Sequence, residues 1–190
     1  MDLLDFIFPK KCLECGTGGK YVCEGCIKKV PPGGSNSIWR YEGVVRKAII
    51  AIKYKFATEI ADELIGYINL PPSKQTLVPI PSYWYKQNFR GFNQAELLGE
   101  KLATKMGWKF IPDLLIKKKP TLPQVGLKGN VRRQNLKGVF VLNPTYLLST
   151  IRYPLVLFDD VYTTGSTLKE AMRVLKESGI KKVSSLTIAR

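Results

Sequence analysis

The apolar residues of this chain alternate between stretches with helical spacing and short hydrophobic runs typical of strands. Helices are predicted where apolar residues recur every three or four positions, at residues 43–55, 57–68, 93–107 and 166–179. Strands are predicted at residues 37–43, 76–81, 139–142, 155–158 and 183–188. This alternation predicts an α/β domain with a mainly parallel central sheet. Residues 139–142 and 155–158 are all apolar, which predicts two central strands buried on both faces.

Three stretches fit neither period. Val30–Ser37 is rich in proline and glycine and predicts a boundary between an N-terminal segment, residues 1–32, and a main domain, residues 33–190. Lys117–Gly138 contains two prolines and three glycines, which predicts a long loop of the kind that is often functional. Residues 1–11 do not fit a secretory signal, because they contain two acids and lack a basic leader. They predict a short amphipathic helix instead.

The chain carries a large excess of positive charge. Its 190 residues include 30 Lys or Arg and 15 Asp or Glu, which gives a net charge of +15. Such an excess favours a polyanionic partner, and charge that merely maintains solubility is the alternative. With 45% apolar residues the chain can bury a core. No apolar run reaches the ~18 residues of a membrane span, so we expect a cytoplasmic protein.

All four cysteines lie within fifteen residues, in the spacing C-x2-C-x7-C-x2-C: Cys12, Cys15, Cys23 and Cys26. Each C-x2-C turn can direct two thiolates at one ion, and two such turns complete the tetrahedral ligand set of Zn2+. Two disulfides or four free thiols are the alternatives, and both are unusual in a cytosolic chain with this spacing. Four protein ligands leave no open position, so the predicted zinc is structural and supplies folding energy to residues 1–32.

The most specific chemical signal is VLFDDVYTTGST, from Val156 to Thr167. A buried strand is expected to end at Asp159 and Asp160, where ligands of open α/β sheets bind. The start of the next helix offers N–H groups to a phosphate, and two carboxylates suit ribose hydroxyls or Mg2+. The stretch therefore predicts a sugar-phosphate site, with an ordinary capped turn as the alternative. The residues expected to cradle the phosphate are Thr163, Thr164, Gly165, Ser166 and Thr167.

This stretch resembles the phosphoribosyl pyrophosphate (PRPP) motif of type I phosphoribosyltransferases, although Tyr162 stands where an aliphatic residue is usual. Together with the four cysteines, VPIP followed by RGFNQ (Arg90–Gln94), and Q..L....R..N..G.F (Gln124–Phe140), it resembles the ComF family. Members are zinc-finger proteins associated with natural competence. The resemblance covers almost the whole chain. It implies a type I phosphoribosyltransferase-like fold with an N-terminal four-cysteine zinc finger.

The resemblance also implies further contacts with PRPP. Pro81 and Ser82 stand where type I enzymes place their pyrophosphate loop, and Arg90 follows just beyond it. Lys117–Gly138 stands where these enzymes place the flexible loop that closes on PRPP. Charged hydrogen bonds from this loop could clamp a pyrophosphate, although a solvated charge is the alternative for each cation. The cations concerned are Lys128, Arg132 and Arg133.

Phosphoribosyl transfer is one possible activity of such a site. Positive charge develops on the anomeric carbon as pyrophosphate leaves, and the acid pair Asp159 and Asp160 could stabilise it while Mg2+ neutralises the leaving group. The chain has no histidine, so a general base would be Asp, Glu, Lys, Tyr or the substrate. No acceptor site is recognisable, and a fold that supports the chemistry does not establish turnover.

Charge and aromatic residues indicate a second function. Thr76–Phe140 contains twelve Lys or Arg and three acids, a net +9 of the total +15. Aromatic residues interleaved with cations in Ser82–Phe92 could stack bases and bind phosphates of a single strand. Burial in the core or a dimer surface is the alternative for some of them. The residues predicted to bind single-stranded DNA are Trp84, Lys86, Arg90, Arg132 and Arg133.

Two functions of different class follow from these patterns. The first is a protein that binds PRPP with Mg2+ and handles single-stranded DNA during DNA uptake in natural transformation, with little or no turnover. The second is an active phosphoribosyltransferase of nucleotide metabolism. An adaptor that docks other competence or DNA-processing proteins is compatible with the first.

Overall fold

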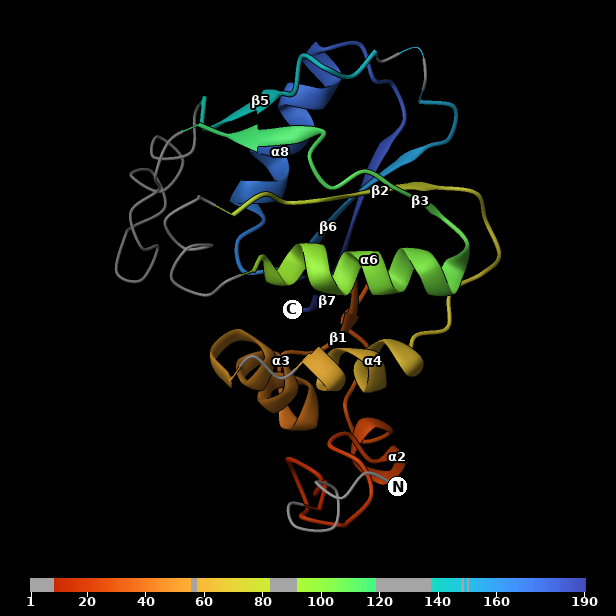
Figure 1. Ribbon diagram of the computed structural model, residues 1–190, viewed down its shortest axis with the longest axis vertical. Coiled ribbons are helices and arrows are strands. Elements are labelled where there is room, and N and C mark those ends of the chain that lie inside the picture. Colours follow the sequence, from red (N-terminus) through yellow and green to blue (C-terminus); the bar gives the residue numbers. More distant parts are fainter. Residues whose placement is uncertain (1–8, 56–57, 83–91, 119–137, 148, 150) are drawn as a thin grey trace.

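The computed structural model describes residues 9–55, 58–82, 92–118, 138–147, 149 and 151–190. A central sheet has helices on both faces, and the four-cysteine segment lies at one end of the molecule (Figure 1). The helices are α2 (Glu24–Ile27), α3 (Gly43–Lys55), α4 (Thr58–Gly66), α6 (Gln94–Met106) and α8 (Ser166–Glu177). The last four lie where the apolar periodicity predicts helices.

The central sheet consists of five strands, and all four of its pairings are parallel. Its strands are β1 (Ser37–Trp39), β2 (Thr76–Pro79), β3 (Lys109–Phe110), β6 (Leu155–Val161) and β7 (Val183–Ala189). They lie in the order β1-β7-β6-β2-β3, which places β6 at the centre. The predicted class, α/β with a mainly parallel sheet, is confirmed. All five strands end at the same edge of the sheet.

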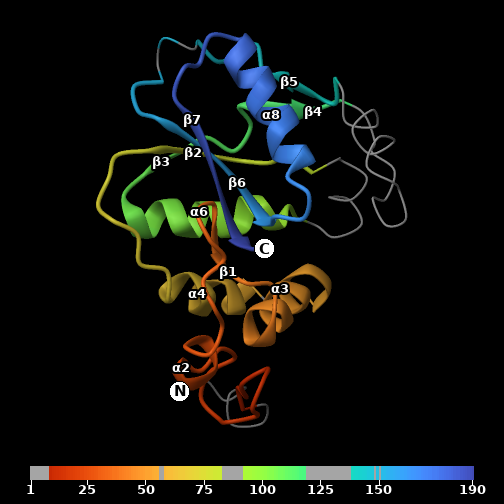
Figure 2. The same cartoon turned by 180° about the vertical axis from the view of Figure 1, so that it is seen from behind.

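Alternate residues of the central strands pack into two separate cores. Leu77 and Phe158 belong to the cluster that includes α6, whereas Val78 and Leu157 belong to the cluster that includes α8. The two helices cover opposite faces of the sheet (Figures 1 and 2). Because both faces are covered, the strand run at 155–158 contains no polar residue.

One predicted central strand is wrong. The run at 139–142 forms β5 (Phe140–Leu142), which pairs antiparallel with β4 (Leu115–Lys117) in a separate two-stranded sheet. Phe140 is 2% exposed and shares a buried cluster with Leu168 of α8. This run is apolar because it packs against α8, and its last two residues are only partly buried.

The described part of the N-terminal segment packs against α3 and α4. The backbone N–H of Val22 donates to the Glu63 carboxylate at 2.7 Å, and the Tyr67 hydroxyl donates to the Val22 carbonyl at 3.0 Å. Apolar residues of the segment join the buried cluster of α3 and α4: Val22, Cys26, Ile27 and Val30. The division at residue 32 stays a prediction, and the parts on either side of it share this core.

Within the described residues, no helix is long and apolar enough to cross a membrane. Two predictions lie largely outside the described residues, namely the amphipathic helix at 1–11 and the long loop at 117–138.

Candidate functional site

The acid pair lies at the carboxyl end of the central strand. β6 continues through Asp159 and Asp160 and ends at Val161, so both acids belong to the strand and lie just before its last residue. The Asp159 Oδ1 accepts a hydrogen bond from the Asp160 N–H at 2.9 Å. The Asp160 Oδ1 accepts from the Val161 N–H at 2.8 Å. Each carboxylate therefore uses one oxygen to fix its own orientation.

Burial controls the protonation of this pair. It raises the pKa of Asp159 well above the usual range for an aspartate, and the neighbouring charge of Asp160 raises it further. A cation offsets part of this repulsion, since the Lys53 Nζ of α3 lies 3.5 Å from the Asp160 Oδ2. The pattern of the sequence did not identify Lys53. It lies 107 residues before Asp160, and no motif in its own helix sets it apart from the other lysines there.

A contact between an aromatic ring and a glycine fixes the loop after the acids. Gly165 has a φ of +69°, in the left-handed region that favours glycine. A Cβ at this position would lie 2.3 Å from the Tyr162 hydroxyl oxygen. The Arg190 guanidinium carbon lies 5.3 Å from the centroid of the same ring. Tyr162, which departs from the usual PRPP motif, therefore leaves no room for a side chain at position 165, where the motif has glycine.

Four hydroxyl side chains surround the start of α8. Thr163 and Thr164 are exposed, whereas Ser166 and Thr167 are partly buried. The Thr164 and Ser166 hydroxyl oxygens lie 2.6 Å apart. Gly165 is the N-cap and has no side chain with which to cap the first N–H groups of the helix. Hydroxyls beside a helix start of this kind can bind a phosphate group.

The segment after β2 reaches the same edge of the sheet. β2 and β6 pair in register, with Pro79 beside Phe158, so Pro81 and Ser82 follow at the carboxyl edge. The Ser82 hydroxyl oxygen is buried and has no hydrogen-bond partner among the residues that the structure describes. A buried hydroxyl without a partner is uncommon and requires an explanation, such as a ligand.

The start of α6 lies beside this segment. The Asn93 side chain caps the helix by accepting from the Ala95 N–H at 3.2 Å. Its Nδ2 donates to the Ile80 carbonyl at 3.1 Å, which joins the start of α6 to the end of β2. The next residue, Gln94, has a buried Nε2 without a hydrogen-bond partner in the described part of the chain. Apart from its place in RGFNQ, nothing in the sequence pattern distinguishes this amide.

Several residues predicted to bind PRPP or DNA lie outside the described residues, and their roles stay predictions. They are Trp84, Lys86, Arg90, Lys128, Arg132 and Arg133.

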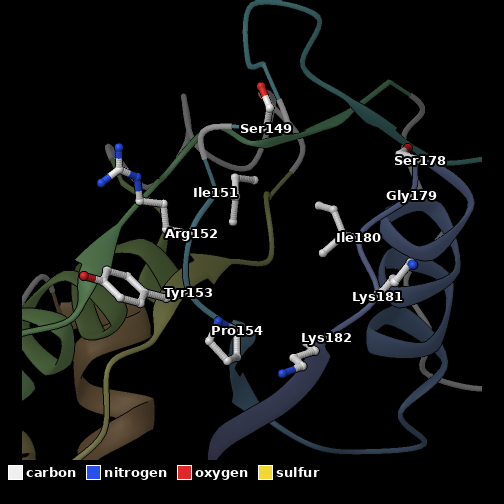
Figure 3. Close-up of a pocket in the computed structure, with 10 residues that line it drawn as sticks. All are labelled: Ser149, Ile151, Arg152, Tyr153, Pro154, Ser178, Gly179, Ile180, Lys181 and Lys182. Atoms are coloured by element: carbon white, nitrogen blue, oxygen red, sulfur yellow. The ribbon is translucent and has the colours of Figure 1, made fainter.

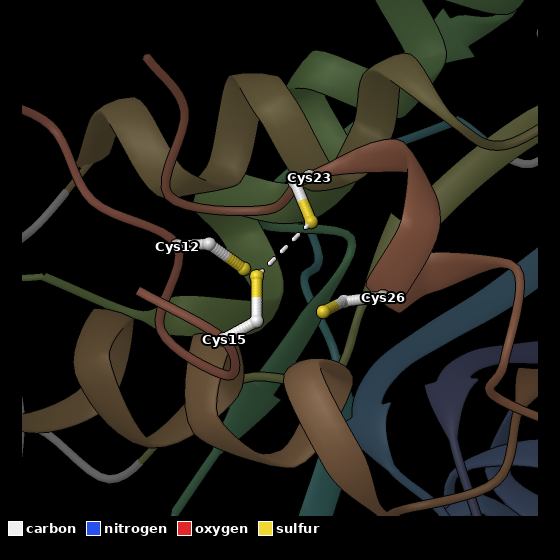
Figure 4. Close-up of side chains that lie close together, drawn as sticks. All are labelled: Cys12, Cys15, Cys23 and Cys26. Carbon is white, nitrogen blue, oxygen red and sulfur yellow. Dashed lines mark hydrogen bonds between the residues drawn. The ribbon is translucent and has the colours of Figure 1, made fainter. Parts of the chain in front are cut away.

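The four cysteines converge on one point (Figure 4). All four Sγ atoms lie within 4.8 Å of one another, although seven residues separate the two C-x2-C turns. All four are free thiols. The Sγ atoms of Cys15 and Cys23 are 3.7 Å apart, which is far longer than the ~2.05 Å of a disulfide. The arrangement favours a metal site over two disulfides.

The distances between these thiols fit a tetrahedral metal. Sulfurs about 2.3 Å from a central ion lie about 3.8 Å apart in a regular tetrahedron, close to the 3.7 Å between Cys15 and Cys23. The Thr17 hydroxyl lowers the pKa of Cys15 to about 6, whereas hydrogen bonding with Cys23 raises the pKa of Cys26 to about 12. Deprotonation of all four thiols at such short distances would therefore require a bound cation.

A basic pocket of about 550 Å³ lies at the opposite edge of the sheet (Figure 3). It is lined by the segment that precedes β6 and the turn between α8 and β7. Its cations are Arg152, Lys181 and Lys182, and none of the described residues that line it is acidic. None of the three cations forms an ion pair with another described residue. Tyr153, 39% exposed, adds an aromatic ring.

Comparison with known proteins assigns the family. No protein-family model matches the chain. Competence protein F of Haemophilus influenzae is 32% identical to it over 94% of this chain and 84% of that protein. The chain belongs to the ComF family. The DNA utilization protein YhgH of Escherichia coli K12 is 27% identical to this ComF-family chain, over 94% of the chain and 83% of the relative.

Among solved structures, the adenine phosphoribosyltransferase of Thermoanaerobacter pseudethanolicus superimposes on the ComF-family chain with a TM-score of 0.39. The two are 15% identical, and the match covers 87% of this chain and 82% of that one. The family assignment rests on the sequence relatives.

Proposed function

We propose that this ComF-family protein binds PRPP with Mg2+ at the carboxyl end of β6 and handles single-stranded DNA during DNA uptake. The acid pair carries the first half of the proposal. Asp159 and Asp160 are held by their own backbone at a strand end, one loop before the start of α8. The loop would bind the 5-phosphate, and the carboxylates would bind the ribose hydroxyls or Mg2+.

Two buried polar groups support a ligand at this edge. The Ser82 hydroxyl and the Gln94 amide nitrogen have no hydrogen-bond partner among residues 9–82 and 92–190 as far as these are described, and the oxygens of a bound phosphate would satisfy both. Ser82 stands where the resemblance expects the pyrophosphate loop. The names of the relatives, competence protein and DNA utilization protein, support the role in DNA uptake.

Calorimetric titration with PRPP in Mg2+ tests the site. The wild-type protein should bind, and Asp160→Asn should weaken binding about tenfold or more, because a charged acceptor contributes about 1.5–3 kcal/mol. Asp62→Asn is the matched control, since Asp62 is an exposed acid that pairs with Lys101 on α6. Wild-type protein that binds no PRPP at millimolar concentration would disprove the proposal.

Turnover is a separate question for the same site. Release of pyrophosphate from PRPP in the presence of an acceptor would favour the alternative, an active phosphoribosyltransferase in nucleotide metabolism. PRPP binding without release would favour a binding role in DNA uptake.

Zinc is the metal that we propose for the four cysteines. An all-thiolate tetrahedral set suits Zn2+, and four protein ligands leave no position for a substrate. The ion would therefore stabilise the N-terminal segment, and through it the packing of this segment against α3 and α4.

DNA binding rests on charge. The chain has a net charge of +15, and the described residues that line the basic pocket include Arg152, Lys181 and Lys182 and no acid. Affinity for a short single strand should fall with salt, at a slope of about 0.7 in log K per phosphate contact. Lys181→Ala should flatten that slope by about 0.7 if the pocket contacts a phosphate. A protein that binds no oligonucleotide at low salt would contradict the DNA role.

A further inference from the structure

The ammonium of Lys53, on α3, lies beside the acid pair at the end of β6. Lys53 lies in the last turn of α3, and its Nζ lies 3.5 Å from the Asp160 Oδ2. The side chain of Asp160 is 14% exposed and that of Lys53 is 31% exposed, so the pair is partly shielded from water.

This ion pair is loose. Charge-assisted hydrogen bonds between an ammonium and a carboxylate are about 2.7–2.9 Å long, and the observed distance is 3.5 Å. The other oxygen of Asp160 already accepts the Val161 N–H. The ammonium is therefore close enough to offset the charge of Asp160 and remains able to bind a second anion.

The chemistry of the proposed ligand indicates what that anion is. A phosphoribosyl group bound across the site has its 5-phosphate at the Thr163–Thr167 loop and its ribose hydroxyls at the acids. The substituent on C1 is adjacent to the 2-hydroxyl, so it lies at the acid end. In PRPP this substituent is a pyrophosphate, whose negative charge would be repelled by Asp159 and Asp160. The proposed Mg2+ would offset part of this repulsion, and Lys53 is a cation of the chain itself that already lies beside Asp160.

We propose that Lys53 is a binding residue for the anionic group on C1 of the ligand, the pyrophosphate of PRPP. The inference rests on the proposed function of the site and adds a specific contact to it. Lys53 would offset the acid pair when the site is free and would donate to the pyrophosphate when PRPP is bound.

Two ligands that differ only at C1 test the contact. Ribose 5-phosphate lacks the pyrophosphate, so Lys53→Ala should leave its affinity within about twofold of wild type. The same variant should bind PRPP about 10- to 100-fold more weakly, because a charged hydrogen bond is lost. Lys53→Arg keeps the charge and should recover part of the affinity for PRPP.

The matched control is Arg46→Ala. Arg46 is exposed on the same helix, two turns before Lys53, and its removal should leave both affinities unchanged. Calorimetry in Mg2+ gives the affinities, and a melting curve for each variant reports its folding.

The outcomes separate the contact from the site. PRPP binding by Lys53→Ala that equals the wild type would overturn the role of Lys53 and leave the PRPP site in place. An equal loss of affinity for both ligands would show that Lys53 only maintains the shape of the acid pair, which also overturns the inference. A wild-type protein that binds neither ligand would remove the proposed function itself.

Discussion

Gly99 tests how closely α6 packs on the sheet. A glycine inside a helix is usually replaced by alanine with a gain of about 1 kcal/mol, since alanine has the higher helix propensity. At Gly99, however, a Cβ would lie 2.9 Å from the Leu77 Cδ2 and 3.2 Å from the Phe158 Cδ1. Both side chains are fully buried in β2 and β6, so neither can move into water.

Two opposing terms decide the sign of the change. Overpacking of a dense core costs about 1–3 kcal/mol, and the gain in propensity offsets about 1 kcal/mol of it. We expect Gly99→Ala to lower the free energy of unfolding by about 1 kcal/mol, a fall in Tm of roughly 2–4 °C for a chain of this length. Urea and thermal unfolding measure both quantities.

The control is Gly66→Ala, at the last residue of α4, where a Cβ would meet no atom within 4 Å. This variant should be neutral or stabilised. In the double variant Gly99→Ala/Leu77→Val, the side chain on β2 is shorter by one methylene, which should make the two changes less costly than their sum. If Gly99→Ala stabilises the protein as much as Gly66→Ala does, the close approach of α6 to the sheet is wrong.

Three further changes test other parts of the molecule. Gly165→Ala should lower stability by more than about 1 kcal/mol and weaken PRPP binding, because an alanine with positive φ is strained and its Cβ would displace Tyr162; normal binding would contradict this role. Cys23→Ser should release the metal, measured by elemental analysis, and lower Tm while cooperative unfolding remains; retained metal would exclude a four-thiolate site. Asp159→Asn should stabilise the protein at neutral pH. Burial raises the pKa of Asp159 in the folded state, so the wild type loses free energy of unfolding as pH rises from about 4 through that pKa. Asparagine does not ionise, so the variant should not lose it. Urea unfolding from pH 4 to 8 should show this fall for the wild type and not for the variant.

Local periodicity predicted most helices and strands because each of them buries a regular set of positions. α3, α4, α6 and α8 each bury one face, and β6 is covered on both, so their apolar patterns are distinct. The run at 139–142 failed for a physical reason. A short apolar segment packed against a helix has the same composition as a central strand, and only its antiparallel pairing with β4 distinguishes the two.

The site was predicted in part. The acids, the loop and the four cysteines each form a short sequence motif. In the structure the acids lie at the end of β6, and the four cysteines lie close together. Ser82 was named from the resemblance and Gln94 only as part of RGFNQ, whereas Lys53 was missed, because tertiary packing alone brings it to Asp160. Tyr162 was identified only as a departure, and its contact with Gly165 depends on the loop geometry.

The pairing of β1 with β7 has a consequence for synthesis of the protein. The Ser37 hydroxyl and the Thr187 hydroxyl hydrogen bond at 2.7 Å, in a buried position, across 150 residues of chain. At 5–20 residues per second, β1 leaves the ribosome roughly 8–30 s before its partner strand. The edge of β1 has no neighbouring strand in the sheet during that interval. The nascent chain should therefore depend on chaperones more than a fold with local pairings, and truncation before β7 should yield protein that aggregates through this edge.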